Sequence, residues 1–185
     1  MRTHELLIAP LFITSFALGS EAAEEPVPPK VGQQAREFRL KSLDGVEIGL
    51  IETLRQGPAV VVVLRGFPGY QCPLCSRQVG ELIASAEDFA AKDARIILVY
   101  PGPADRLDER AREFLKDTKL PGNFVLVTDP DYSFTNAYGL RWHAALETAY
   151  PSTFVISKDN IVSFALVSRA HGGRAKTSDV FGALE

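Results

Sequence analysis

The feature of this sequence that most constrains its fold is an alternation of short apolar runs with helix-like segments. AVVVVL (59–64) and RIILVY (95–100) are continuous and rich in β-branched residues, which is typical of strands buried on both faces of a sheet. Between them, apolar residues recur at helical spacing over residues 73–91 and predict one long helix. Two strands joined by such a helix are expected to run parallel in one sheet.

The rest of the chain continues this alternation. We expect further strands at residues 37–40, 124–127, 154–156 and 161–167, and further helices at 107–115, 133–138 and 177–184. The letters SKDN between the last two strands predict an antiparallel hairpin. The predicted class is α/β: a central mixed β-sheet flanked by helices, in one domain spanning residues 31–185.

The N-terminal residues differ in composition from this domain. The apolar run Leu6–Gly19 is shorter than the roughly 20 residues that a membrane-spanning helix needs, and small residues follow it. This pattern predicts a signal peptide at residues 1–22, followed by a flexible, proline-rich lead-in at 23–30. We therefore expect an exported protein, periplasmic or extracellular, with no stable membrane span after processing. The alternatives are an uncleaved anchor and a buried N-terminal helix.

The overall composition narrows the classes of partner. The 185 residues are 46% hydrophobic and 23% charged, which is typical of a soluble globular protein. A net charge of −3 gives no reason to expect nucleic acid or an anionic membrane as partner.

Both cysteines of the chain, Cys72 and Cys75, lie in the stretch CPLC, at the junction between the strand at 59–64 and the start of the long helix. Free backbone N–H groups and the positive end of the helix dipole stabilise a thiolate at such a place. Arg65 and Arg77 are candidates to add positive charge. Cysteines three residues apart can also close a disulfide on each other, so the spacing favours a redox-active pair.

Two other roles for the cysteines are weaker. A structural disulfide over so small a loop removes little chain entropy. A zinc site needs more ligands, and after the N-terminal segment only His143 and His171 remain, without ligand-like spacing. We expect no metal and no cofactor.

Four segments together carry a family resemblance: VGQQAREFRLKSLDGVEIGL, CPLC, VTDPDYSFTNAYGL and YPSTFVISKDNIVSF. They resemble the thioredoxin-like redoxins of the AhpC/TSA (peroxiredoxin-like) and TlpA-like kinds, over about residues 31–185. The resemblance implies a thioredoxin-like fold. It also implies that Pro151 is cis and lies beside the two cysteines, where the backbone before it pairs with a substrate thiol.

The cysteine motif itself departs from the peroxiredoxins that the chain resembles. Those proteins carry Pro-x-x-x-Thr/Ser-x-x-Cys, in which the cysteine attacks peroxide. Here Pro68 and Cys75 match the motif, but Cys72 occupies the Thr/Ser position.

The chain also differs from the peroxiredoxins at the position of their active-site arginine. The resemblance would place an arginine, which helps stabilise the reactive thiolate, at the position of Pro151. Arg169 and Arg174, in the stretch SRAHGGRAK, are candidates to replace it from a neighbouring loop. The alternative is that this stretch is only a solvated basic turn.

We expect an enzyme, and thiol–disulfide exchange is the first hypothesis. In it Cys72, at an exposed helix start, attacks a substrate disulfide and Cys75 resolves the mixed disulfide. The groups expected to hold the partner chain are Tyr150 and Pro151, with an apolar border of Tyr70 and Phe67.

The alternative is an antioxidant thiol peroxidase with Cys75 as the peroxidatic cysteine and Cys72 resolving. The expected partners are protein thiols and disulfides or a peroxide, with a separate electron donor or acceptor.

A hypothesis of another class is a copper-binding assembly protein. Two thiolates and one imidazole suit copper, with His143 or His171 as the third ligand. The exported thioredoxin-like proteins that handle copper use a CxxxC spacing, however, and the CxxC spacing here favours exchange.

Overall fold

The apolar run after residue 58 forms the central strand β3 (Ala59–Val63), in which every residue is fully buried. On one side β3 pairs in parallel with β4 (Arg95–Gly102), and β4 pairs in parallel with β5 (Phe124–Pro130). On its other side β3 pairs antiparallel with β6 (Ser152–Ile156). The parallel half of the sheet therefore lies where the sequence predicts it.

Three further strands complete the sheet: β1 (Arg39–Ser42), β2 (Glu47–Gly49) and β7 (Val162–Val167). This is a computed structural model, and it describes residues 25–116 and 118–184. Within them the seven strands lie in the order β2-β1-β5-β4-β3-β6-β7, and the outer pairs are antiparallel. The predicted mixed sheet and the antiparallel hairpin between β6 and β7 are confirmed.

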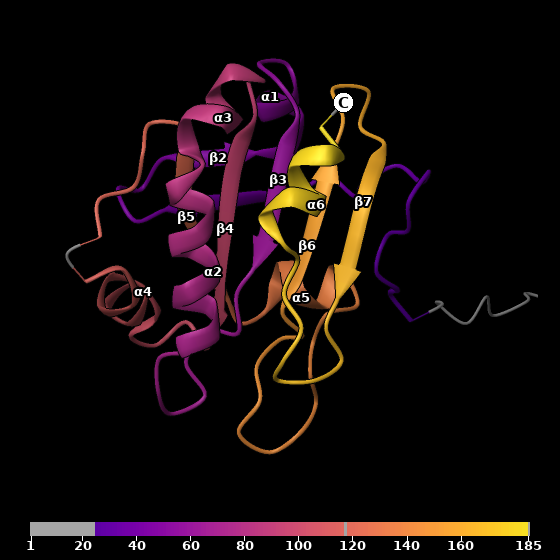
Figure 1. Cartoon of the computed structure of the whole chain (residues 1–185). Helices are drawn as coiled ribbons and strands as arrows, with labels where there is room; N and C mark the ends of the chain where they lie inside the picture. The colour runs from indigo at the N-terminus through magenta and orange to yellow at the C-terminus, as the bar shows by residue number, and fades with distance from the viewer. Residues whose placement is uncertain (1–24, 117, 185) are drawn as a thin grey trace, which may run out of the picture.

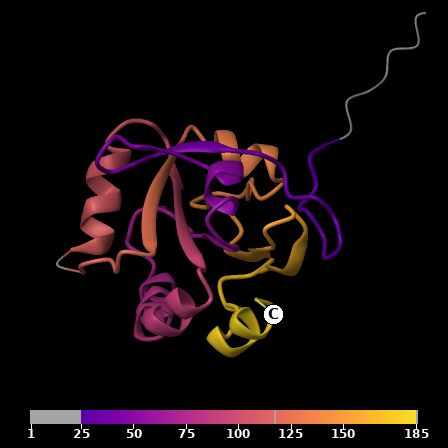
Figure 2. The same ribbon diagram turned by 90° about the horizontal axis from the view of Figure 1, so that it is seen from above.

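Helices cover both faces of the sheet. Their bounds are α1 (Leu50–Leu54), α2 (Pro73–Ala84), α3 (Ala86–Ala91), α4 (Leu107–Leu115), α5 (Ser133–Ala137) and α6 (Thr177–Gly182). Figure 1 shows α2, α3 and α6 in front of the sheet, and Figure 2 shows α1 and α5 on its opposite face. Side chains of β3 alternate between the two layers: Val60 and Val62 pack with the α2 layer, Val61 and Val63 with the α1 and α5 layer.

Two features of the fold differ from the sequence prediction. The expected single helix over residues 73–91 is wrong, because it breaks at Ser85 into α2 and α3. Ser85 has φ −106° and ψ 20°, and its N–H bonds to the carbonyl of Leu82. The break turns the chain so that Phe89 is fully buried against the sheet. The short elements β2 and α1 are too brief to give a periodic signal and were not predicted.

The predicted signal peptide at residues 1–22 lies outside the described residues and stays a prediction. The part of the lead-in that is described lies against the domain. Gly139, with φ +63°, approaches the carbonyl of Pro26 so closely that a Cβ there would collide with it. Across residues 25–116 and 118–184, no helix combines the length and apolarity that crossing a membrane requires.

Candidate active site

The two cysteines lie at the start of α2, which follows β3 after a loop (Figure 1 shows both elements). Cys72 is the N-cap residue, and its Sγ accepts a hydrogen bond from the backbone N–H of Cys75 at 3.4 Å. Pro73 takes the first helical position, where its missing N–H costs nothing. Both cysteines are free thiols and both are buried, with 4% and 1% exposure. The prediction that Cys72 faces solvent is wrong, because neighbouring loops cover the helix start.

The loop between β3 and α2 holds the cysteines in place through its backbone and through Gln71. The backbone N–H of Arg65 donates to Cys75 Sγ at 3.4 Å. The hydroxyl of Tyr100 donates to Gln71 Oε1 at 2.8 Å, and Gln71 Nε2 donates to the carbonyl of Arg110 at 2.9 Å. The residue before Cys72 is therefore fixed to both β4 and α4.

One guanidinium group lies against both sulfur atoms. Arg174 Nη2 is 3.6 Å from Cys72 Sγ and 3.5 Å from Cys75 Sγ. Its Nη1 donates to the carbonyls of His171 and Gly173, at 3.1 and 2.9 Å. Arg174 Nε is buried and has no hydrogen-bond partner among the residues described, so one N–H donor of this guanidinium is unused.

These contacts separate the pKa values of the two thiols. A hydrogen bond from the Cys75 thiol lowers the pKa of Cys72 to about 5; the backbone N–H of Cys75 and the charge of Arg174 act in the same direction, while burial opposes them. The same hydrogen bond, burial and the charge of Cys72 raise the pKa of Cys75 well above its usual range. In the reduced protein Cys72 is therefore the more acidic thiol of the pair, and Cys75 the less acidic one.

The side chain of Arg65 is directed away from the sulfur atoms, toward a buried carboxylate. Arg65 Nε lies 2.9 Å from Glu147 Oε2, and its Nη2 lies 3.0 Å from Glu147 Oε1. Arg65 Nη1 donates to the hydroxyl of Tyr70 at 2.5 Å. Arg65 thus contributes only its backbone N–H to the thiols. The sequence had indicated that its positive charge would act on them.

Glu147 is the site residue that sequence reasoning missed. Its side chain is 8% exposed, and its Oε1 also lies 2.6 Å from His171 Nε2. Burial raises the pKa of the Glu147 carboxyl, but the bonds from Arg65 and His171 outweigh it and the net pKa is lowered. The stretch AALETAY around it has no motif that would have marked an ion pair.

An aromatic wall of Trp142 and Tyr150 lies beside this ion pair. The two rings stack at 4.9 Å between centroids, and the ring of His171 is 5.0 Å from that of Trp142. The Arg169 guanidinium lies over the Tyr150 ring at 4.6 Å. The sequence offered Arg169 and Arg174 as candidates for the arginine of the site. Arg174 contacts the sulfur atoms, whereas Arg169 packs on the Tyr150 ring of the aromatic wall.

The expected cis peptide bond before Pro151 is wrong: none of the residues described has a cis peptide bond. The backbone groups there are also occupied. The N–H of Tyr150 donates to the carbonyl of Leu140 at 2.8 Å, and the carbonyl of Pro151 accepts from the N–H of Ser168 at 2.9 Å. The Tyr150 carbonyl accepts from the Ser152 hydroxyl at 2.8 Å. The N–H and carbonyl of Tyr150 and the carbonyl of Pro151 therefore already have hydrogen-bond partners within the chain.

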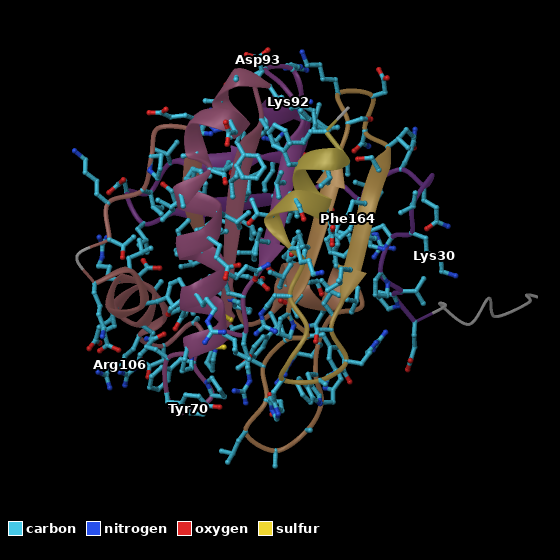
Figure 3. All side chains as sticks on the ribbon, in the orientation of Figure 1. Lys30, Tyr70, Lys92, Asp93, Arg106 and Phe164 are labelled. Atoms are coloured by element: carbon cyan, nitrogen blue, oxygen red, sulfur yellow. The ribbon has the colours of Figure 1, made fainter. Side chains whose placement is uncertain are left out.

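The remaining predicted residues are spread around the site. Tyr70 is 53% exposed and lies at the end of the molecule where α2 begins (Figure 3). Phe67 and Pro68 are half-buried, and the guanidinium of Arg110 covers the Phe67 ring at 4.1 Å. Arg77 is exposed on α2 and bonds to no described side chain, so its charge is not part of the site.

The copper hypothesis gains no support from this arrangement. Within residues 25–116 and 118–184, no three His, Cys, Asp or Glu side chains are grouped so as to hold a metal ion. His171 bonds to Glu147, and His143 lines a different cavity together with Trp142 and Arg141.

Comparison with known proteins decides the family. Residues 31–165 match the family described as AhpC/TSA. The chain belongs to the AhpC/TSA family. A Helicobacter pylori protein named as a peroxiredoxin, bcp, is 31% identical over 138 residues, which cover 72% of this chain and 84% of that protein.

Solved structures of this family share the fold. Mycobacterium tuberculosis AhpC superposes with a TM-score of 0.68 at 17% identity, covering 85% of this chain and 96% of that one. The peroxidoxin BcpB of M. tuberculosis gives a TM-score of 0.64 at 20% identity, covering 84% and 96%. The resemblance drawn from the sequence is confirmed: this AhpC/TSA protein is a peroxiredoxin-like oxidoreductase with a thioredoxin-like fold. Family membership implies a peroxide substrate and a thiol reductant.

Proposed function

We propose that this AhpC/TSA protein is a thiol peroxidase that cycles Cys72 and Cys75 between dithiol and disulfide. The observation that carries the proposal is the position of Arg174, whose guanidinium contacts both sulfur atoms and keeps one N–H donor unused. A cation at this place stabilises the thiolate, and it also stabilises negative charge that develops on peroxide oxygen as the O–O bond breaks.

The reaction consists of two steps. The Cys72 thiolate attacks one oxygen of a hydroperoxide; an S–O bond forms, the O–O bond breaks, and the other oxygen leaves as an alcohol or water after taking a proton. Cys72 is then a sulfenic acid. The Cys75 sulfur attacks it, the S–S bond forms, and the hydroxyl leaves as water with the Cys75 proton. A dithiol reductant returns the two electrons by thiol–disulfide exchange.

We assign the attack to Cys72 because the thiolate is the nucleophile and the pKa of Cys72 is the lowered one. The position of Cys75 in the family motif favours the opposite assignment, with Cys75 peroxidatic and Cys72 resolving. The two assignments differ in which single variant keeps its first oxidation step.

The test is peroxide oxidation of the reduced protein, followed by the loss of free thiols, in the native chain and in Cys75→Ser and Cys72→Ser. We expect the native protein to consume one peroxide per disulfide formed. Cys75→Ser should still react and should give a sulfenic acid at Cys72 that dimedone traps. Cys72→Ser should react no faster than an ordinary free thiol.

Two results would count against parts of this proposal. A sulfenic acid trapped at Cys75 in Cys72→Ser, with an inert Cys75→Ser, would transfer the attack to Cys75. A native protein that reduces protein disulfides rapidly but is oxidised by peroxide no faster than a free thiol of the same pKa would replace the peroxidase with an exchange enzyme.

The compartment belongs to the proposal as well. Residues 1–22 have the pattern of a signal peptide, so we propose that the peroxidase acts after export. Fractionation of cells that produce the full chain checks this; a product that stays in the cytoplasm with its first 22 residues retained would contradict it.

A further inference from the structure

The carboxylate of Glu147 bonds to two of the segments that form the site. One segment is the end of β3, through the two bonds to Arg65. The other is the loop after β7, through the 2.6 Å contact to His171. Glu147 itself belongs to the loop before β6. At the lower end of Figure 1 the loops before β6 and after β7 lie side by side.

The bond to Arg65 decides which arginine acts at the thiols. Arg65 lies two residues beyond the end of β3, and its own N–H donates to Cys75 Sγ, so its backbone is at the site. Its guanidinium is nonetheless held by Glu147, by the Tyr70 hydroxyl and by the carbonyl of Leu146. The Arg65 side chain is 6% exposed and fully engaged, which leaves Arg174 as the cation that contacts sulfur.

The contact to His171 fixes the loop that carries Arg174. Three consecutive carbonyls, those of His171, Gly172 and Gly173, accept hydrogen bonds from Arg174 Nη1. The direction in which these carbonyls point depends on where His171 is anchored. Ser168 anchors the same loop from its other side, because its hydroxyl donates to the carbonyls of Ala170 and Gly172.

We propose that Glu147 is a positioning residue that keeps Arg65 away from the thiols and, through His171, holds Arg174 over them. Glu147 acts through these two residues and does not touch sulfur. The proposal rests on the role given above to Arg174, but it concerns the placement of a charge and so can be tested without peroxide.

The experiment compares Glu147→Gln and His171→Ala with the native full chain. Glu147→Gln keeps the shape of the side chain and removes its charge. Because breaking a buried ion pair can prevent folding, His171→Ala is the second variant; the His171 side chain is 60% exposed, and its loss leaves the Arg65–Glu147 pair intact. Glu109→Gln, which breaks an exposed pair with Arg106 away from the thiols, is the matched control.

The first readout is the pH at which Cys72 becomes half-reactive toward iodoacetamide, and the second is kcat/KM for hydrogen peroxide. We expect His171→Ala to raise the pH midpoint, because Arg174 is then no longer held over the sulfur atoms. Glu147→Gln also frees the Arg65 guanidinium, whose charge opposes this rise, so its midpoint should lie below that of His171→Ala. We also expect kcat/KM to fall by about tenfold in Glu147→Gln and about threefold in His171→Ala, the size of effect typical when one group of a hydrogen-bond and ion-pair network is removed. The control should match the native chain in both readouts.

An unchanged alkylation midpoint in His171→Ala would overturn the positioning role of Glu147 toward Arg174, and a midpoint in a folded Glu147→Gln above that of His171→Ala would overturn its role in keeping Arg65 away from the thiols. Raised midpoints in a protein that does not react with peroxide would support the positioning role and refute the peroxidase.

Discussion

Replacing Arg174 with Gln tests how much the guanidinium stabilises the Cys72 thiolate. At the observed 3.6 Å, a unit charge pair is worth roughly 1 kcal/mol in water and roughly 4–5 kcal/mol at the effective dielectric constant of a protein surface. Arg174 is half-buried and shares the thiolate with the Cys75 thiol and backbone N–H groups. We therefore expect the lower part of that range, about 1.4–2.7 kcal/mol, or about 1 to 2 pKa units.

The Cys72 pKa should then rise from about 5 to between about 6 and about 7 in Arg174→Gln. The measurement is the pH dependence of alkylation rate, checked by the ultraviolet absorbance of the thiolate. Because at least about half of the thiolate would remain at pH 7, a loss of peroxide rate there beyond about twofold must come from the transition state.

Arg169→Gln is the matched control for this change. It removes the same charge from the same loop, but its guanidinium lies on the Tyr150 ring and not on sulfur. An Arg174→Gln midpoint equal to the native one, or an equal shift in both variants, would refute the reasoning, because the effect would then not depend on contact with the thiols.

Three further predictions follow from the same contacts and from the core. The rate of reaction with peroxide should be constant between neutral and mildly acidic pH and should fall as the pH drops through about 5, because Cys72 loses its negative charge there. A fall centred near pH 8 would contradict the lowered pKa of Cys72. Phe89→Ala should lower the free energy of unfolding by about 3–5 kcal/mol in urea titration, because this ring is fully buried and contacts Phe181; a cost under about 1 kcal/mol would show that the site collapses freely. Gly66→Ala should destabilise the fold and slow thiol oxidation, because Gly66 has φ +72° and a Cβ would collide with the carbonyl of Pro101; equal thermal stability would refute it.

The parts of the fold that the sequence predicted are those set by local pattern. The run at residues 59–64 is buried on both faces, and such a strand is recognisable without knowledge of its neighbours. The position of the cysteines at a helix start follows from the same local reasoning. The break at Ser85 was not predictable in this way, because it depends on how Phe89 meets the sheet.

The parts of the site that escaped prediction depend on loops that meet only in the folded chain. The sequence offered both Arg169 and Arg174, and only the fold shows which guanidinium lies on sulfur. Glu147 is 82 residues from Arg65 along the chain, so nothing near either residue indicates their ion pair. The cis geometry of Pro151 was inferred from the thioredoxin-like side of the resemblance, and the residues described contain no cis peptide bond.

The short spacing of the two cysteines has a consequence for the proposed peroxidase cycle. A sulfenic acid is destroyed when a second peroxide converts it to sulfinic acid before another thiol reaches it. Here the second thiol, that of Cys75, belongs to the same helix start, and the backbone N–H of Cys75 already bonds to Cys72 Sγ, so the two residues are in contact before the disulfide forms. The vulnerable state is therefore brief. Such a site is suited to sustained scavenging at high peroxide concentration, and poorly suited to a sensor that must be inactivated by a burst of oxidant.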